Sequence, residues 1–225
     1  MIINHNETKE IINKALEKCQ GIIAESLKFF EDSEKIRADK DLVPDAKDRK
    51  ILEVENAAKE KAKNICSELT ELVEGFEKVE KENSLCFDVS DAKVLGVTEI
   101  MNSMGSDADA ELCASVVETF KGQYLALKYL KSIFKKNGLS TEKIDSVIVN
   151  IDEVCEELRD LINDVHNEGI KSAANAFKLK HKLIDIADNL NLGIKFSEEE
   201  KNLGADYEQY LDSVRFPSGM NDSEE

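Results

Sequence analysis

Histidine and carboxylate side chains at short helical spacings are the residues of this sequence that could bind a metal ion or transfer a proton. His181 and Asp185 are four positions apart and would share one helix face, whereas His166 and Asp164 are two apart and would not. A di-metal site in a helical bundle uses Glu-x-x-His repeats with glutamates on the other helices, and the sequence contains no Glu-x-x-His. We therefore expect no metal site and no cofactor.

Other catalytic motifs are also missing. The sequence has no Gly-x-x-x-x-Gly-Lys or Gly-x-Gly-x-x-Gly loop for phosphates, no Gly-x-Ser-x-Gly and no His-Glu-x-x-His. His5, the third histidine, lies in an N-terminal stretch that we expect to be frayed. We therefore predict that the protein is not an enzyme and assign no catalytic residue. A small-molecule enzyme within residues 107–191 is a further alternative, which a deep polar pocket containing His166 or His181 would support.

Composition excludes several classes of partner. The net charge of −17 argues against direct binding of nucleic acid, which relies on clustered Lys and Arg, and against adhesion to anionic membranes. We expect neither a membrane-spanning helix nor a signal peptide, because the sequence has no run of eighteen apolar residues and its first residues show no basic start followed by an apolar run. Five cysteines at wide intervals, an odd number without Cys-x-x-Cys, indicate a reducing compartment. We predict a soluble cytoplasmic protein.

Two long helices are predicted at the start of the chain, over residues 8–39 and 44–82. The second has nine apolar positions at alternating spacings of three and four, close to the a/d seam of a coiled coil, which must pack along another helix. Six of these are our candidates for contacts with a partner: Ile51, Val54, Ile65, Leu69, Leu72 and Phe76.

The two helices are expected to meet at a proline. Pro44 would break a helix interior but fits the first position of a new helix, where its missing N–H is not needed. The short connection before it favours an antiparallel hairpin. A single bent helix is the alternative.

The rest of the chain is predicted to form a helical bundle. A short helix is predicted at about 91–103, followed by longer ones at 107–136, 140–167 and 170–191, separated by glycine-bearing turns such as Asn137-Gly138. The predicted fold is all-α. Its three regions are a long helical hairpin (1–83), a bundle of about three to four helices (84–196), and an acidic short helix with a mobile tail (197–225).

The turn between the first two helices also carries a family resemblance. The residues are Leu42-Val43-Pro44-Asp45-Ala46-Lys47, followed by Asp48-Arg49-Lys50-Ile51. Over residues 8–82 the chain resembles helical proteins of phages of Gram-positive hosts, encoded near the portal and capsid genes, in which a Leu-Thr-Pro-x-x-Lys turn joins two long helices. The resemblance implies a structural or assembly role, with the protein in the host cytoplasm or in a virion, and assigns no functional residue.

Two functions follow as hypotheses. The first is a non-enzymatic structural or assembly protein, capsid-associated or scaffold-like, that forms homo-oligomers or binds capsid proteins through its helices. The basic stretch 121–136 offers a docking face for an acidic partner, with Lys128, Lys131 and Lys135 as candidates. The alternative is an acidic inhibitor that presents Asp152, Glu156 and Asp160 to a host nuclease or defence protein in place of DNA phosphates.

Overall fold

The chain is all-α, as predicted. The computed structural model describes residues 5–84, 88–168 and 173–197, and this part of the chain contains eight α-helices, one short 3-10 helix and no strand. None of its helices is long and apolar enough to cross a membrane. The segment that we predicted as an acidic helix and tail lies almost wholly outside the described residues.

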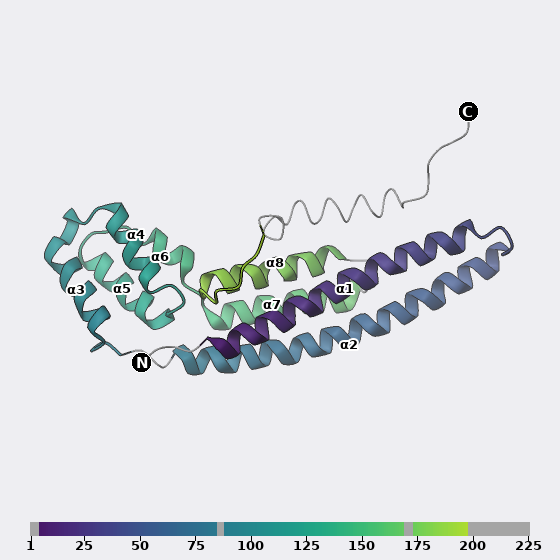
Figure 1. Cartoon of the computed structure of the whole chain (residues 1–225), viewed down its shortest axis with the longest axis horizontal. Helices are drawn as coiled ribbons and strands as arrows, with labels where there is room; N and C mark the ends of the chain where they lie inside the picture. The colour runs from purple at the N-terminus through teal and green to yellow at the C-terminus, as the bar shows by residue number, and fades with distance from the viewer. Residues whose placement is uncertain (1–4, 85–87, 169–172, 198–225) are drawn as a thin grey trace, which may run out of the picture. The chain divides into compact units, whose positions relative to one another are not determined.

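Helices α1 (Asn6–Ala38) and α2 (Pro44–Ser84) form the predicted hairpin, and Figure 1 shows them running antiparallel. At about 1.5 Å per residue they are roughly 50 and 60 Å long. Helix α2 begins at Pro44, which confirms the predicted role of this residue and rules out the single bent helix. Lys47 holds the turn closed, because its Nζ donates to the backbone oxygen of Arg37 at 2.6 Å.

The face that α1 buries has a regular period of three and four residues, although some of its members are polar. Its buried positions include Thr8, Ile12, Ala15, Cys19, Ile22, Ser26, Phe29 and Ser33. Those spacings keep one stripe facing a neighbouring helix. Ion pairs flank the packed faces of α1 and α2, including Lys61 with Glu25 at 2.9 Å and Lys18 with Glu68. Exposed pairs of this kind add little stability, so burial of the stripe dominates.

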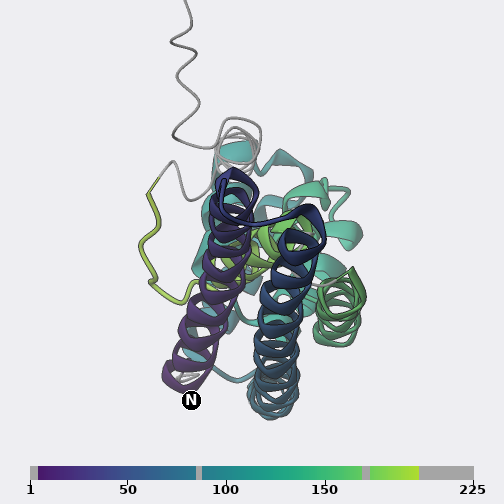
Figure 2. The ribbon, with the colours of Figure 1, turned by 90° about the vertical axis from the view of Figure 1, so that its right-hand side faces the viewer.

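The chain divides into two compact units, and neither is a continuous stretch of sequence. Unit 1 consists of 1–11, 75–155 and 185–194, and unit 2 of 12–74, 156–184 and 195–225. This division differs from the predicted domains, because parts of α7 (Ile151–Glu168) and α8 (Ala173–Asn189) belong with the hairpin in unit 2. Figure 2 looks along the hairpin and shows α1 and α2 beside each other.

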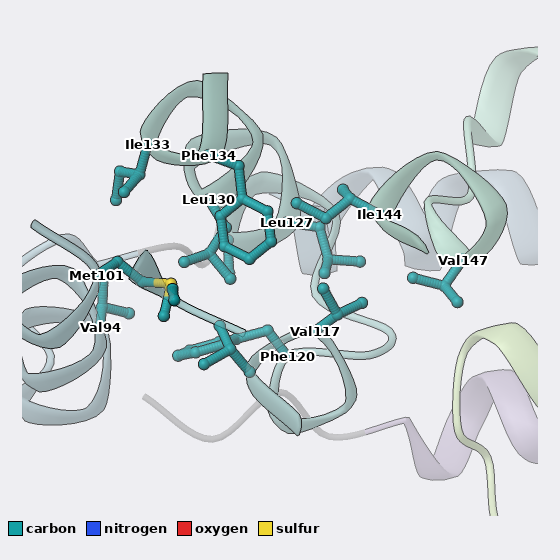
Figure 3. Packing of buried hydrophobic residues seen from close by; sticks show 13 residues of the cluster. Val94, Met101, Val117, Phe120, Leu127, Leu130, Ile133, Phe134, Ile144 and Val147 are labelled. Carbon is teal, nitrogen blue, oxygen red and sulfur yellow. The ribbon is translucent and has the colours of Figure 1, made fainter. Parts of the chain in front are cut away.

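Unit 1 holds the shorter helices. These are α3 (Ala92–Met104), η1 (Gly105–Asp107), α4 (Ala110–Thr119), α5 (Tyr124–Lys136) and α6 (Glu142–Val147). Figure 3 shows their apolar side chains converging on one core, with Met101 from α3, Val117 from α4, Phe134 from α5 and Ile144 from α6 all at most 1% exposed. Helix α3 confirms the predicted short helix.

Two predicted helices are each divided in the structure, so these two predictions were wrong. The helix expected over 107–136 is interrupted between α4 and α5, where Gly122 adopts a φ of +83°. A side chain could not replace its hydrogen, because a Cβ there would lie 2.4 Å from the backbone oxygen of Leu190. The helix expected over 140–167 is interrupted at 148–150, between α6 and α7. The predicted stop at Asn137-Gly138 is confirmed, with Gly138 at φ +71°.

Candidate functional site

A cavity of about 590 Å³ lies in unit 1, at the C-terminal end of α2. This volume is in the range of small-molecule sites. Its lining mixes apolar side chains from α3, α5 and the 147–151 segment with polar ones. The polar side chains include His5, Glu80, Asn83, Asp88, Asp91, Lys93, Lys121, Gln123, Tyr124 and Asn191.

Glu80 is the buried acid of this cavity, with only 4% of its surface exposed. Three donors converge on its Oε1 atom. Thr8 Oγ1 donates to it from the first turns of α1, Asn83 Nδ2 donates to it at 2.9 Å from the same helix, and His5 Nδ1 lies 3.3 Å away. A carboxylate can accept several such bonds, and each is stronger than one between neutral groups.

These bonds keep Glu80 ionised. Burial by itself would raise the pKa of the carboxyl group, because the charged form loses its hydration. The hydrogen bonds from His5, Thr8 and Asn83, together with the charge of His5, outweigh burial, and the pKa of Glu80 lies below its ordinary value. The cavity therefore has a negatively charged group in its wall.

Three other charged side chains of the cavity have local structural roles. Asp91 caps α3, since its Oδ1 accepts from the backbone N–H of Lys93 at 2.8 Å, and Asp88 accepts from the backbone N–H and hydroxyl of Ser90. The Nζ atom of Lys121 lies 3.5 Å from Oδ2 of Asp188 on α8. Together they fix the turns before α3 and α5 that form the cavity wall.

The predicted contact residues of α2 face the interior of the chain. Leu69 and Phe76 are each 1% exposed, and the other four, Ile51, Val54, Ile65 and Leu72, are half-buried. The seam is therefore largely occupied by the chain's own helices and offers little surface to another molecule.

The predicted lysines of α5 differ in their surroundings. Lys128 is exposed and lies over the ring of Tyr124, 5.2 Å from its centroid. Lys131 forms an ion pair with Asp145 of α6, and Lys135 is exposed in the last turn of α5, where a cation suits the helix dipole.

The structure places the three histidines in surroundings that differ from those the sequence suggested. His166 is exposed, and His181 is half-buried with Nε2 enclosed and unpaired in the described part of the chain. Within these residues no three of His, Cys, Asp and Glu are grouped so that they could hold a metal ion. The expectation that His5 lies in a frayed start was wrong, because His5 is 18% exposed and contacts Glu80.

Sequence reasoning therefore missed the two residues that meet in the cavity wall. Glu80 looks like one more acid of a charged helix, and its partner lies 75 positions away. A signal was present, because Glu80 follows Phe76 by four positions and continues the buried face of α2. A charged residue at the end of such a face indicates a buried carboxylate that needs partners.

Comparisons with known proteins do not identify the chain: no model of a protein family, no curated protein and no solved structure matches it.

Proposed function

We propose that this protein is a non-enzymatic structural or assembly protein of a phage particle, capsid-associated or scaffold-like. It acts through helix–helix contacts with copies of itself or with capsid proteins. The proposal rests on the resemblance of residues 8–82 described above and on the surface of the hairpin tip, which comprises residues 35–52.

The observation that carries the proposal is the pair of exposed apolar side chains at the tip. Val43 is 65% exposed and Leu52 is 55% exposed, the two highest values among the large apolar side chains of the described residues. Leu52 lines a shallow hollow together with Leu42, Pro44 and Ile51, among others. Apolar surface that the chain leaves uncovered at a protruding turn favours contact with another protein.

The charge of the tip supports the same interpretation. Residues 35–52 carry six bases and four acids, a net charge of +2, in a chain whose net charge is −17. The bases are Lys35, Arg37, Lys40, Lys47, Arg49 and Lys50, and the acids are Asp39, Asp41, Asp45 and Asp48. A basic tip on an acidic protein is complementary to the acidic faces of a second copy.

We propose the hairpin tip, rather than the apolar seam of α2, as the surface that contacts a partner. Because Leu69 and Phe76 are buried within the chain, they could reach another molecule only after the packing of the chain is opened. Val43 and Leu52 need no such rearrangement.

A tip variant tests the proposal. Val43→Ser combined with Leu52→Ser removes the apolar contact and leaves the helices intact. The native mass of this variant should fall to that of the monomer under conditions in which the wild type associates. Leu95→Ser in α3, at a site that is 47% exposed, is the control and should leave the mass unchanged. Association that survives the double substitution would assign the contact to another surface.

The second candidate is the acidic inhibitor. Asp152, Glu156 and Asp160 of the predicted face are exposed along α7, which supports a surface that imitates DNA phosphates. One of these three acids is already paired, however, because Asp152 Oδ1 lies 2.8 Å from Lys81 Nζ. The neighbouring Glu157 is paired with Lys182. If the protein is such an inhibitor, a host protein captured at low salt should be released at high salt, because ions screen exposed charges.

A further inference from the structure

Within the described residues, every hydrogen bond to the carboxylate of Glu80 ends on the same oxygen. All three donors described above, from His5, Thr8 and Asn83, bond to Oε1. Oε2 has no hydrogen-bond partner among the residues that the structure describes. A buried carboxylate with an unused oxygen is unusual, because leaving a charged acceptor unsatisfied is energetically unfavourable.

The free oxygen belongs to a side chain that lines the cavity. Across the described ranges, the side-chain atoms that are both fully enclosed and unpaired are Ser33 Oγ and His181 Nε2. Oε2 has no partner but is not among them, so it keeps some exposed surface. Glu80 is one of the residues that line the cavity, and 4% of its surface is exposed.

The charges around the cavity favour a cation. Its wall carries three acids, Glu80, Asp88 and Asp91, against two lysines, Lys93 and Lys121, and one histidine, His5. Lys121 is also engaged by Asp188, an acid outside the lining. The potential inside a concave site of this kind attracts positive charge.

The cation that fits is organic rather than a metal ion. A metal ion needs several ligand atoms at fixed distances, and the described residues provide no group of three acidic, histidine or cysteine side chains for one. An ammonium group needs only an acceptor for its N–H bonds, and Oε2 of Glu80 is such an acceptor. The apolar lining can cover an alkyl chain, and includes Val94, Phe120, Leu127, Val147, Ile151 and Leu190.

We propose that this cavity binds a small aliphatic ammonium compound, with the ammonium group donating to Oε2 of Glu80 and the alkyl chain lying against the apolar wall. The proposal does not depend on the assembly role, because every residue it uses belongs to unit 1 and the hairpin tip belongs to unit 2.

Titration calorimetry on the full chain with pentylammonium chloride tests this proposal. The wild type should bind the compound saturably, whereas 1-pentanol, which has the same chain without the charge, should not bind. Glu80→Gln should weaken binding by about tenfold or more, the usual effect of losing a bond to a charged group. Glu82→Gln removes the same charge from an exposed position two residues away and should leave binding unchanged.

A second variant covers the possibility that Glu80→Gln does not fold. Ala92 is exposed and lines the cavity, so Ala92→Trp occupies part of the cavity without removing any bond to Glu80. It should also weaken binding, with an unchanged circular dichroism spectrum. The proposal is overturned if the wild type shows no saturable binding, or if Glu80→Gln binds as well as the wild type. Equal losses in Glu80→Gln and Glu82→Gln would reduce the effect to surface charge and would overturn it too.

Discussion

Thr8 and Glu80 lie 72 positions apart in the sequence, and the hydroxyl of Thr8 donates a buried hydrogen bond to the carboxylate of Glu80. The bond joins the first turns of α1 to the last turns of α2. It therefore fixes the ends of the two helices opposite Pro44, while Lys47 and Arg37 fix the turn. Because the partner is a charged and buried group, this bond contributes more than a typical surface contact.

The first prediction concerns this bond. Thr8→Val keeps the shape of the side chain and removes the donor, so the free energy of unfolding at pH 7 should fall by about 1.5–3 kcal/mol. Thr98→Val is the matched control, because Thr98 Oγ1 donates to a neutral backbone oxygen of the same helix at 2.7 Å. That variant should lose about 1 kcal/mol or less. Urea unfolding of both variants measures the difference.

The effect of Thr8→Val should depend on pH. The folded-state pKa of Glu80 is below the ordinary value of 4.5. The ionised carboxylate therefore contributes stability above that value and loses it as the pH falls through the folded-state pKa. The difference between wild type and Thr8→Val should shrink over that range, whereas the Thr98→Val difference should stay constant. A Thr8→Val effect equally large in strong acid would mean that Glu80 is not the acceptor that matters.

Glycine substitutions should separate a required glycine from a dispensable one. Gly122→Ala forces a Cβ to within 2.4 Å of the Leu190 backbone oxygen at a φ of +83°, and should destabilise the protein by about 2 kcal/mol or more. Gly96→Ala lies inside α3 with nothing within 4 Å of its Cβ. It should stabilise by about 0.5–1 kcal/mol, because alanine loses less backbone entropy in a helix. Denaturant unfolding of the two variants gives the comparison, and similar signs for both would contradict it.

The packing of α2 predicts that leucine-to-alanine substitutions will lower the free energy of unfolding strongly at a buried position and little at an exposed one. Leu69 is 1% exposed, so Leu69→Ala should lower the free energy of unfolding by about 2–5 kcal/mol. Leu52 is 55% exposed, so Leu52→Ala should change it by about 0.5 kcal/mol or less. A large loss in Leu52→Ala would show that the tip is covered by the chain itself.

Thiol reactivity should follow burial. Burial raises the pKa of Cys19 to about 12 and that of Cys66 to about 11, and both side chains are at most 2% exposed. Cys113 is half-buried, and burial raises its pKa too. Because the thiolate is the reactive form, iodoacetamide at pH 8 should label Cys113 well before Cys19 and Cys66. Peptide mass spectrometry reads the order, and early labelling of Cys19 would show that α1 separates readily from its neighbours.

The long helices could be predicted because their apolar residues repeat without interruption and Pro44 marks the turn. The break at Gly122 could not, because the apolar residues on both sides of it still fit one helical period. A Cβ at Gly122 would meet the backbone of Leu190, and no local pattern reveals this approach of a distant segment.

The cavity was missed for a related reason. The buried face of α1 begins with Thr8 and includes Ser26 and Ser33, so a search for apolar residues alone does not find its full length. The partners of Glu80 are polar residues near the start of the chain, where local patterns indicate only a helix end. Contacts between distant polar residues have no sequence period, whereas packed apolar faces do.

The central claim, that the protein acts by associating through its hairpin tip, is tested most directly by the native mass of the wild type over a range of concentrations. We predict a defined oligomer by sedimentation equilibrium, one that dissociates in the Val43→Ser, Leu52→Ser variant. A wild-type protein that stays monomeric at high concentration and does not associate with capsid proteins would contradict the account.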